Sequence, residues 1–246
     1  MQTHTPGNTT SGTPLRETLR LMASKILPHD STKTTCPPAP LVSGAGPTII
    51  VSSLMRSGTH LLLDSLFNNY LALRRFPLFV DFDAYERQGL PVTPLNTLCG
   101  VVIKTHYPET PLAGPYATAL AKIAARSIVL TPNRNSVEVR NSLAKWGMDF
   151  SPAEFADIEN RFKKFWSQYS PTVVEFRRLL DPAGVQSVLG QVSQRTGLES
   201  ERSTKPVMPA SSRYGVYFDK TLTRIAGGRA PRINTTIGYR LAPKQR

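Results

Sequence analysis

TIIVSSLMRSGTHLLLDSLFNNY, residues 48–70, is the stretch that decides the fold. Its first five residues are mostly apolar and β-branched, which predicts a strand buried on both faces. From Gly58 onward, Leu62, Leu66 and Tyr70 recur at helical spacing, which predicts a helix with one apolar face. A strand, a short loop and a helix in this order are typical of an α/β fold built on a parallel sheet.

The loop between this strand and this helix predicts an anion site. The first backbone N–H groups of a helix have no partner within the helix, and the helix dipole favours negative charge there. Gly58 lets an anion approach the backbone, while Arg56, Ser57 and Thr59 add side-chain donors. The GxxxxGK[ST] pattern of ordinary ATP-binding loops is absent. A helix capped by a serine after a turn is the alternative interpretation.

Strand and helix patterns alternate along the rest of the chain. They predict one α/β domain, residues 41–246, with a central parallel sheet flanked by helices. Further strands are expected at residues 101–104, 127–131 and 172–176, and further helices at 112–125, 137–146, 152–169 and 184–196. Residues 1–40 are expected to form a flexible N-terminal segment, with one short amphipathic helix on which Leu15, Leu19, Met22 and Ile26 share a face.

Lys104 and His106 lie at the end of the second of these strands. Open α/β sheets bind ligands at this edge. The i, i+2 spacing lets both side chains point toward Arg56 if the two strands are neighbours. The pair is therefore a candidate general base and a candidate electrostatic stabiliser. A single His at a strand end is also often a structural, hydrogen-bonded residue.

Arg134 and Ser142 follow the next strand. They lie about two helical turns apart, so both could face one anion. An ion pair between Arg134 and Glu138 is the alternative role for this arginine.

Taken together, three motifs resemble the sulfotransferases that use 3'-phosphoadenosine 5'-phosphosulfate (PAPS). They are RSGT after the first strand, KTH at a later strand end, and an Arg followed eight residues later by Ser, in that family's order. The resemblance runs from about residue 48 to residue 198. Within it, VEFRRLLDP at residues 174–182 looks like the family's strand followed by Tyr-Glu-Asp-Leu. It implies a P-loop-NTPase-like sulfotransferase fold.

The resemblance also implies which residues bind the donor. Those expected at the 5'-phosphosulfate are Arg56, Ser57, Gly58, Thr59 and His60. Those expected at the 3'-phosphate are Arg134 and Ser142, with Arg229 and Arg232 as the nearest counterparts of a late Arg-Lys-Gly loop. Phe176 stands where the family usually has a Tyr beside adenine, and Leu61 where cytosolic members often have a Trp.

The reaction expected from the resemblance is transfer of a sulfuryl group from PAPS to a hydroxyl or amine, without a metal. The acceptor would be a small molecule, a lipid or a carbohydrate. His106 would take the acceptor proton, while Lys104 and Arg56 would neutralise growing charge. A nucleotide-dependent phosphotransferase on a related P-loop scaffold is one alternative, and a basic polyanion- or RNA-binding protein is another.

The charge balance favours anionic ligands. The chain contains 30 Lys and Arg against 17 Asp and Glu, a net charge of +13. Residues 201–246 hold ten of the basic residues against only Glu201 and Asp219. PAPS would account for part of this charge, so nucleic acid is not the expected partner. The sequence shows neither a secretory signal nor a membrane span, which predicts a cytoplasmic protein.

Overall fold

The computed structural model describes residues 46–73 and 79–200. The whole N-terminal segment predicted at residues 1–40, including its amphipathic helix, and the last part of the predicted domain lie outside the described residues. Arg229 and Arg232 are among the residues outside. The account below is therefore an account of the core of the predicted domain.

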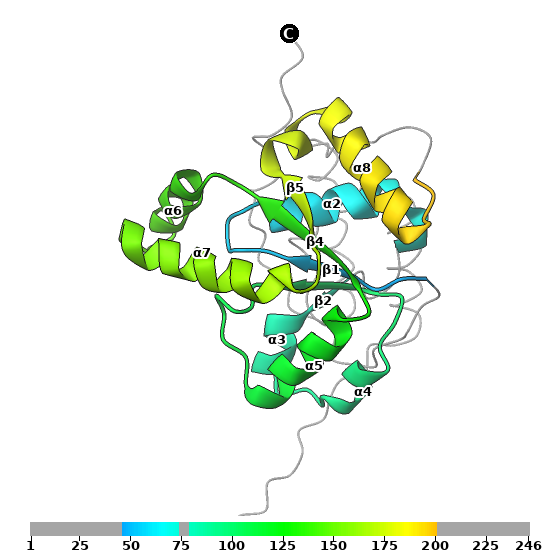
Figure 1. Cartoon of the computed structure of the whole chain (residues 1–246), viewed down its shortest axis with the longest axis horizontal. Coiled ribbons are helices and arrows are strands. Elements are labelled where there is room, and N and C mark those ends of the chain that lie inside the picture. The colour runs from blue at the N-terminus through cyan, green and yellow to red at the C-terminus, as the bar shows by residue number, and fades with distance from the viewer. Residues whose placement is uncertain (1–45, 74–78, 201–246) are drawn as a thin grey trace, which may run out of the picture.

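Five parallel strands form a single sheet in the order β2-β3-β1-β4-β5 (Figure 1). The central strand, β1 (Ile49–Ser52), pairs with β3 (Val102–Thr105) on one side and with β4 (Ile128–Asn133) on the other. The edges are β2 (Val80–Asp81) and β5 (Thr172–Glu175). The predicted parallel sheet is thus confirmed, and the four predicted strands lie within a residue or two of the observed ones. β2 was not predicted.

Both faces of the sheet are buried, as parallel sheets require. Ile49 and Val51 of β1 point into one apolar cluster, and Ile50 between them points into the other. All three side chains have no exposed surface. This alternation explains why the sequence of β1 is continuously apolar rather than alternating apolar and polar.

Helices cover the two faces in two groups (Figure 1). One face packs against α2 (Thr59–Asn69) and α8 (Pro182–Thr196). The other packs against the remaining helices, which are α3 (Phe82–Arg87), α4 (Thr93–Asn96), α5 (Gly114–Ala124), α6 (Ser136–Ala144) and α7 (Pro152–Ser167). Two short 3₁₀ helices complete the described elements, η2 (Leu71–Leu73) and η3 (Phe176–Leu180).

Local sequence sets the helix ends. α7 begins with a capping box in which the Ser151 hydroxyl accepts from the Glu154 amide and the Glu154 carboxylate accepts from the Ser151 amide. α8 begins at Pro182 behind the Asp181 cap, and it ends at Gly197, whose φ of 68° suits the left-handed C-cap.

The strand order places a crevice beside β1. The chain leaves β1 toward β2 and β3, but it leaves β4 toward β5, so the connections diverge between β1 and β4. Ligands of open α/β sheets bind outside the carboxyl ends of the strands at such a point. The loop after β1 and the residues after β4 therefore meet where the sequence predicts a ligand.

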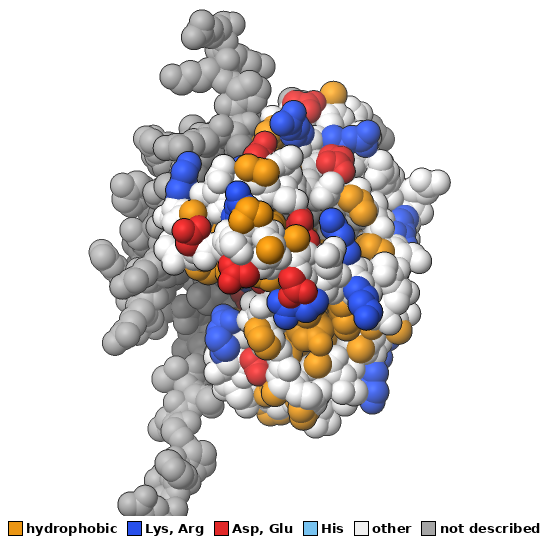
Figure 2. Space-filling model, turned by 60° about the vertical axis from the view of Figure 1, so that its left-hand side comes forward, with side chains coloured by type: hydrophobic (Ala, Val, Ile, Leu, Met, Phe, Trp, Pro, Cys, Tyr) orange, Lys and Arg blue, Asp and Glu red, His pale blue; other side chains and the backbone are white. Residues whose placement is uncertain are grey.

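The described part of the chain is nearly neutral. It contains 14 Lys and Arg and 13 Asp and Glu, a net charge of +1, whereas the whole chain carries +13. Figure 2 shows basic and acidic side chains interspersed on the side of the molecule that carries α6 and α7. Among the described residues, no helix combines the length and apolar character needed to cross a membrane.

Candidate active site

A cavity of about 740 Å³ lies at the carboxyl edge of the sheet. Its lining comes from the segments that follow four of the five strands. They are Met55, Arg56, Gly58, Thr59, His60 and Leu61 after β1, His106 after β3, Arg134, Glu138, Asn141, Ser142, Lys145, Trp146 and Met148 after β4, and Phe176 after β5. The fold thus brings the three sequence motifs together in one cavity.

The loop after β1 opens α2 without a side-chain cap. The N-cap residue is Gly58, so the alternative of a serine-capped helix is wrong. The first-turn amides of an uncapped helix have no intrahelical partners and are available to a ligand. The Ser57 hydroxyl is turned inward: it donates to the Leu54 carbonyl at 2.7 Å, and Ser57 does not line the cavity. It shapes the loop instead of facing the cavity.

Gly58 and Phe176 fit against each other. Gly58 has a φ of 113°, a conformation that side-chain-bearing residues rarely adopt. A Cβ on this residue would lie 2.6 Å from Cδ2 of Phe176. The ring therefore packs directly on the glycine that begins α2, and it joins the end of β5 to the loop after β1.

His106 is held as a neutral imidazole. Its Nδ1 lies 2.7 Å from the carbonyl oxygen of Ser53, and a carbonyl can only accept, so Nδ1 carries the proton. The Nε2 lone pair is consequently free for a ligand. Burial, with a smaller contribution from the positive charge of Lys104, lowers the pKa of His106 to about 3, although the Ser53 bond opposes the change. The ring is neutral at every working pH.

Ser53 also links His106 to α2. The Ser53 hydroxyl lies 3.3 Å from Nδ1 of His106 and 2.6 Å from the Thr59 hydroxyl. Thr59 lines the cavity but is itself almost fully buried. Ser53, Thr59 and His106 thus form one chain of polar contacts between β1, α2 and β3.

Lys104 lies in the sheet behind the cavity rather than in its lining. Its ammonium group is 3.1 Å from Asp81 and 3.6 Å from Asp83. Burial raises the pKa of Asp83. For Asp81 the effect of burial is outweighed by Lys104 and the Ala84 amide, and its pKa falls below the ordinary value. Lys104 therefore reaches His106 through its field, not through a position in the cavity.

Arg56 and Arg134 lie on the same wall of the cavity. Arg56, whose φ is 66°, donates from Nε to the Ser142 hydroxyl at 2.9 Å, and its guanidinium stacks on the Trp146 ring at 4.3 Å. Arg134 donates to the Arg56 carbonyl at 3.1 Å. Burial lowers the pKa of Arg56, and the nearby charge of Arg134 adds to this effect. Two half-buried arginines close together in one cavity are a favourable binding site for an anion.

Arg134 also makes the predicted ion pair. Its Nε donates to Glu138 at 3.0 Å, and its guanidinium lies 4.5 Å from the centre of the Phe176 ring. Arg134 therefore forms the ion pair given as the alternative, and it also lines the cavity, while its role in binding an anion stays a prediction. Glu138 accepts from Nε and the Arg56 carbonyl accepts from Nη1, so two contacts fix this guanidinium beside the cavity.

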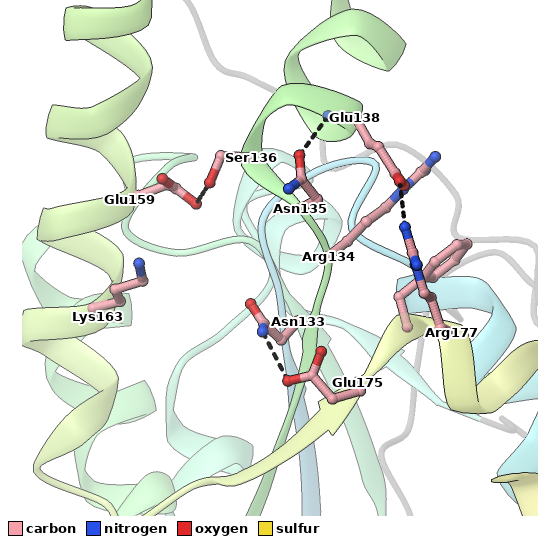
Figure 3. Close-up of a pocket in the computed structure, with 10 residues that line it drawn as sticks. Asn133, Arg134, Asn135, Ser136, Glu138, Glu159, Lys163, Glu175 and Arg177 are labelled. Carbon is pink, nitrogen blue, oxygen red and sulfur yellow. Dashed lines mark hydrogen bonds and ion pairs between the residues drawn. The ribbon is translucent and has the colours of Figure 1, made fainter.

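A second, shallower cavity of about 400 Å³ lies on the far side of Arg134 (Figure 3). Its walls are cross-linked by hydrogen bonds from Asn133 to Glu175, at 2.9 Å, and from Ser136 to Glu159, at 2.7 Å. The first bond joins β4 to β5, and the second joins α6 to α7. These bonds fix the segment that presents Arg134.

Glu109 is buried beside the loop. Its Oε2 accepts the Met55 amide at 2.6 Å, and its Oε1 is buried without a hydrogen-bond partner among the described residues. The pKa of Glu109 is raised to about 7, mainly by burial and also by the charge of Asp83, although the Met55 amide and Lys104 oppose the rise. A titratable carboxyl therefore lies directly behind the first loop residue that lines the cavity.

The sequence interpretation missed Trp146, Glu109 and Asp83. Trp146 was predicted as the end of a helix, and no individual role in the site was assigned to it. Its 51% exposure at the cavity mouth, with Arg56 stacked on it, depends on a tertiary contact. Glu109 follows the KTH motif in KTHYPE and could have been suspected from that position. Asp83 lies on a helix that the sequence pattern did not predict.

Comparisons of the chain with models of protein families, with curated proteins and with solved structures returned no match.

Gly58→Ala should destabilise the protein by roughly 1–3 kcal/mol or more, because it combines a strained φ with a clash against Phe176. Urea unfolding measures this cost. Gly89→Ala is the matched control, since Gly89 also has a positive φ but open space around it. The double variant Gly58→Ala, Phe176→Ala should lose less than the two single losses added together. Equal costs at Gly58 and Gly89 would contradict the contact.

Glu109→Gln should flatten the pH dependence of stability. Because the folded pKa lies above the unfolded value, the folded protein binds this proton more tightly. The stabilisation is complete below the unfolded pKa of 4.5 and is lost as the pH rises through about 7. The slope contributed is at most about 1.4 kcal/mol per pH unit.

This slope is measured from urea unfolding between pH 4.5 and 7.5, in the wild type and in Glu109→Gln. Glutamine keeps an acceptor for the Met55 amide but does not titrate. Glu199→Gln, at an exposed side chain, controls for the change in net charge. An unchanged slope in Glu109→Gln would show that Glu109 does not titrate in this range.

Proposed function

We propose that the chain is a PAPS-dependent sulfotransferase with a P-loop-like sulfotransferase fold. One observation carries the proposal: a single cavity receives the loop after β1, His106 after β3, and Arg134 with Ser142 after β4. These are the motifs that resemble the family, and they are separated by tens of residues in the sequence.

The proposed donor fits the cavity. A volume of about 740 Å³ lies within the range of nucleotide-sized binding sites. The uncapped start of α2, with Gly58, Thr59 and Arg56, would hold the 5'-phosphosulfate. Ser57 would shape the loop but would not bind the phosphosulfate through its side chain, because its hydroxyl donates within the loop.

The 3'-phosphate would lie against Arg134 and Ser142, which Arg56 already links to the loop. Adenine would lie beside Phe176, whose ring is fixed between Gly58 and the Arg134 guanidinium. The cavity thus offers Arg56 at the loop and Arg134 beside Phe176 as cationic contacts for the donor, with Lys145 in the same lining. ATP has no 3'-phosphate and would lack the contact proposed at Arg134 and Ser142.

The chemistry assigned to the site needs one base and local positive charge. The donor supplies the sulfuryl group: the acceptor oxygen or nitrogen bonds to sulfur, the bond between sulfur and the 5'-phosphate oxygen breaks, and the electron pair leaves with that oxygen. Nε2 of His106 accepts the acceptor's proton. Arg56 neutralises charge on the transferred group, and Lys104 contributes through its field from behind the cavity.

The acceptor would enter beside Trp146, Met148 and Met55, which form an apolar and aromatic edge of the cavity. Such an edge suits the ring of a small molecule, a lipid or a carbohydrate that carries a hydroxyl or an amine. The described part carries a net charge of only +1, so within it the positive charge offered to the donor is local, at Arg56, Arg134 and Lys145 of the cavity.

Calorimetric titration tests the proposed donor. 3'-Phosphoadenosine 5'-phosphate (PAP) should bind more tightly than ATP, without added divalent metal. Arg134→Ala should weaken PAP binding by roughly 10- to 100-fold, because a charge-assisted hydrogen bond is worth about 1.5–3 kcal/mol. Arg161→Ala removes an exposed arginine paired with Asp157 on α7 and should leave PAP binding unchanged. Tighter binding of ATP would overturn the assignment.

Turnover tests the role of His106. Release of PAP from PAPS is followed with panels of phenols, amines and glycans as acceptors. With any acceptor that the wild type uses, His106→Ala should lower kcat by about 10²- to 10⁴-fold, the usual contribution of a general base. PAP affinity should stay near the wild-type value and serves as the control for folding. A variant that keeps its turnover would remove His106 from the mechanism.

A further inference from the structure

The turn that follows β3 is held by one carboxylate, that of Asp83. Its Oδ1 accepts the Thr105 hydroxyl at 2.8 Å, and its Oδ2 accepts the His106 amide at 2.9 Å. The Lys104 ammonium lies 3.6 Å from the same Oδ2. Three consecutive residues of the KTH motif therefore converge on Asp83, which is only 2% exposed.

Thr105 connects Asp83 to the backbone of Tyr107. Its hydroxyl donates to Asp83 and at the same time accepts the Tyr107 amide at 3.0 Å. The backbone from Thr105 to Tyr107 is thereby tied to α3, in addition to its pairing in the sheet. A hydroxyl that both donates and accepts leaves this turn little freedom.

The imidazole of His106 is thus held at two points. Asp83 fixes the backbone amide, and the Ser53 carbonyl fixes Nδ1 of the ring at 2.7 Å. The second contact decides which ring nitrogen carries the proton, but it forms only if the backbone presents the ring at the right place. The bond from the His106 amide to Asp83 holds the backbone in that place.

We propose that Asp83 is the positioning residue of the site: by accepting the Thr105 hydroxyl and the His106 amide, it holds the imidazole with Nδ1–H on Ser53 and Nε2 toward the cavity. The meaning of this role for catalysis rests on the proposed function. The geometric part does not, because it concerns only the tautomer and the orientation of one ring.

Neutralisation of the buried Lys104 is the competing explanation for Asp83. Asp81 provides the comparison, because it binds Lys104 more closely, at 3.1 Å. Its other oxygen accepts the Ala84 amide as the cap of α3, and it has no hydrogen bond to Thr105 or His106. If charge neutralisation were the role, Asp81→Asn and Asp83→Asn would have the same effect on His106.

The first test uses NMR of the imidazole rings in ¹⁵N-histidine-labelled full-length protein. The chain has four histidines, and the signals of His106 are assigned by their loss in His106→Asn. The wild type should show one neutral tautomer, with the proton on Nδ1. Asp83→Asn should give a mixture of tautomers. Asparagine has one acceptor oxygen and one NH₂ group, so it can accept from the Thr105 hydroxyl or from the His106 amide but not from both. Asp81→Asn should keep the wild-type tautomer.

The second test is kinetic. Asp83→Asn should lower kcat by about 10²-fold, the size of effect expected from a misplaced catalytic group, while PAP binding changes less than about twofold. In the double variant with His106→Ala, Asp83→Asn should have no further effect on kcat, because Asp83 acts through His106. An additive loss would show that Asp83 has another role.

Thr105 provides a second route to the same answer if Asp83→Asn does not fold. Thr105→Val removes the hydroxyl that joins Asp83 to Tyr107, whereas Thr105→Ser keeps it. Only the valine variant should disturb the His106 tautomer. An undisturbed tautomer in Asp83→Asn or in Thr105→Val, or equal disturbance by Asp81→Asn, overturns the proposal. Absence of any sulfuryl transfer by the wild type would instead count against the proposed function, and the NMR result would still decide the role of Asp83.

Discussion

The parallel pairing of β1 with both β3 and β4 is the constraint on which the rest of the structure depends. It aligns the carboxyl ends of three strands, so that the residues following each strand emerge at one edge. The pairing continues beyond the strands, because the Ser53 amide donates to the Thr105 carbonyl at 3.1 Å. That extra bond places Ser53 beside the His106 turn. The polar contacts of the cavity follow from this register.

The sequence was sufficient for the features that depend on local pattern. Continuous apolar runs predicted the four longer strands, and helical spacing predicted the five longer helices. The loop from Arg56 to Thr59 was recognisable because an apolar strand precedes it and an apolar helix face follows. His106 was predicted to approach it on the assumption that the two strands are neighbours, and the pairing of β1 with β3 confirms that assumption.

Features that depend on tertiary contacts could not be predicted from the sequence. β2 has two residues and α3 has six, which is too short for either periodicity to appear. Asp83 lies in the stretch FDAYER, where an acidic residue is typical of a first helical turn. Only the packing of α3 against the end of β3 turns it into a buried acceptor. The inward direction of the Ser57 hydroxyl is likewise a property of the folded loop.

The links from Arg56 to Arg134 and to Ser142 of α6 have a consequence for selectivity. Arg56 bonds to Ser142, and its carbonyl accepts Arg134, so the loop that opens α2 and the segment after β4 are mechanically joined. An anion that binds one of the two arginines changes the contacts of the other. The two ends of a doubly charged ligand would therefore bind cooperatively, with a coupling free energy shared between them. A site built in this way would distinguish a nucleotide with two separated phosphate groups from one with a single phosphate chain, beyond what either contact alone could achieve.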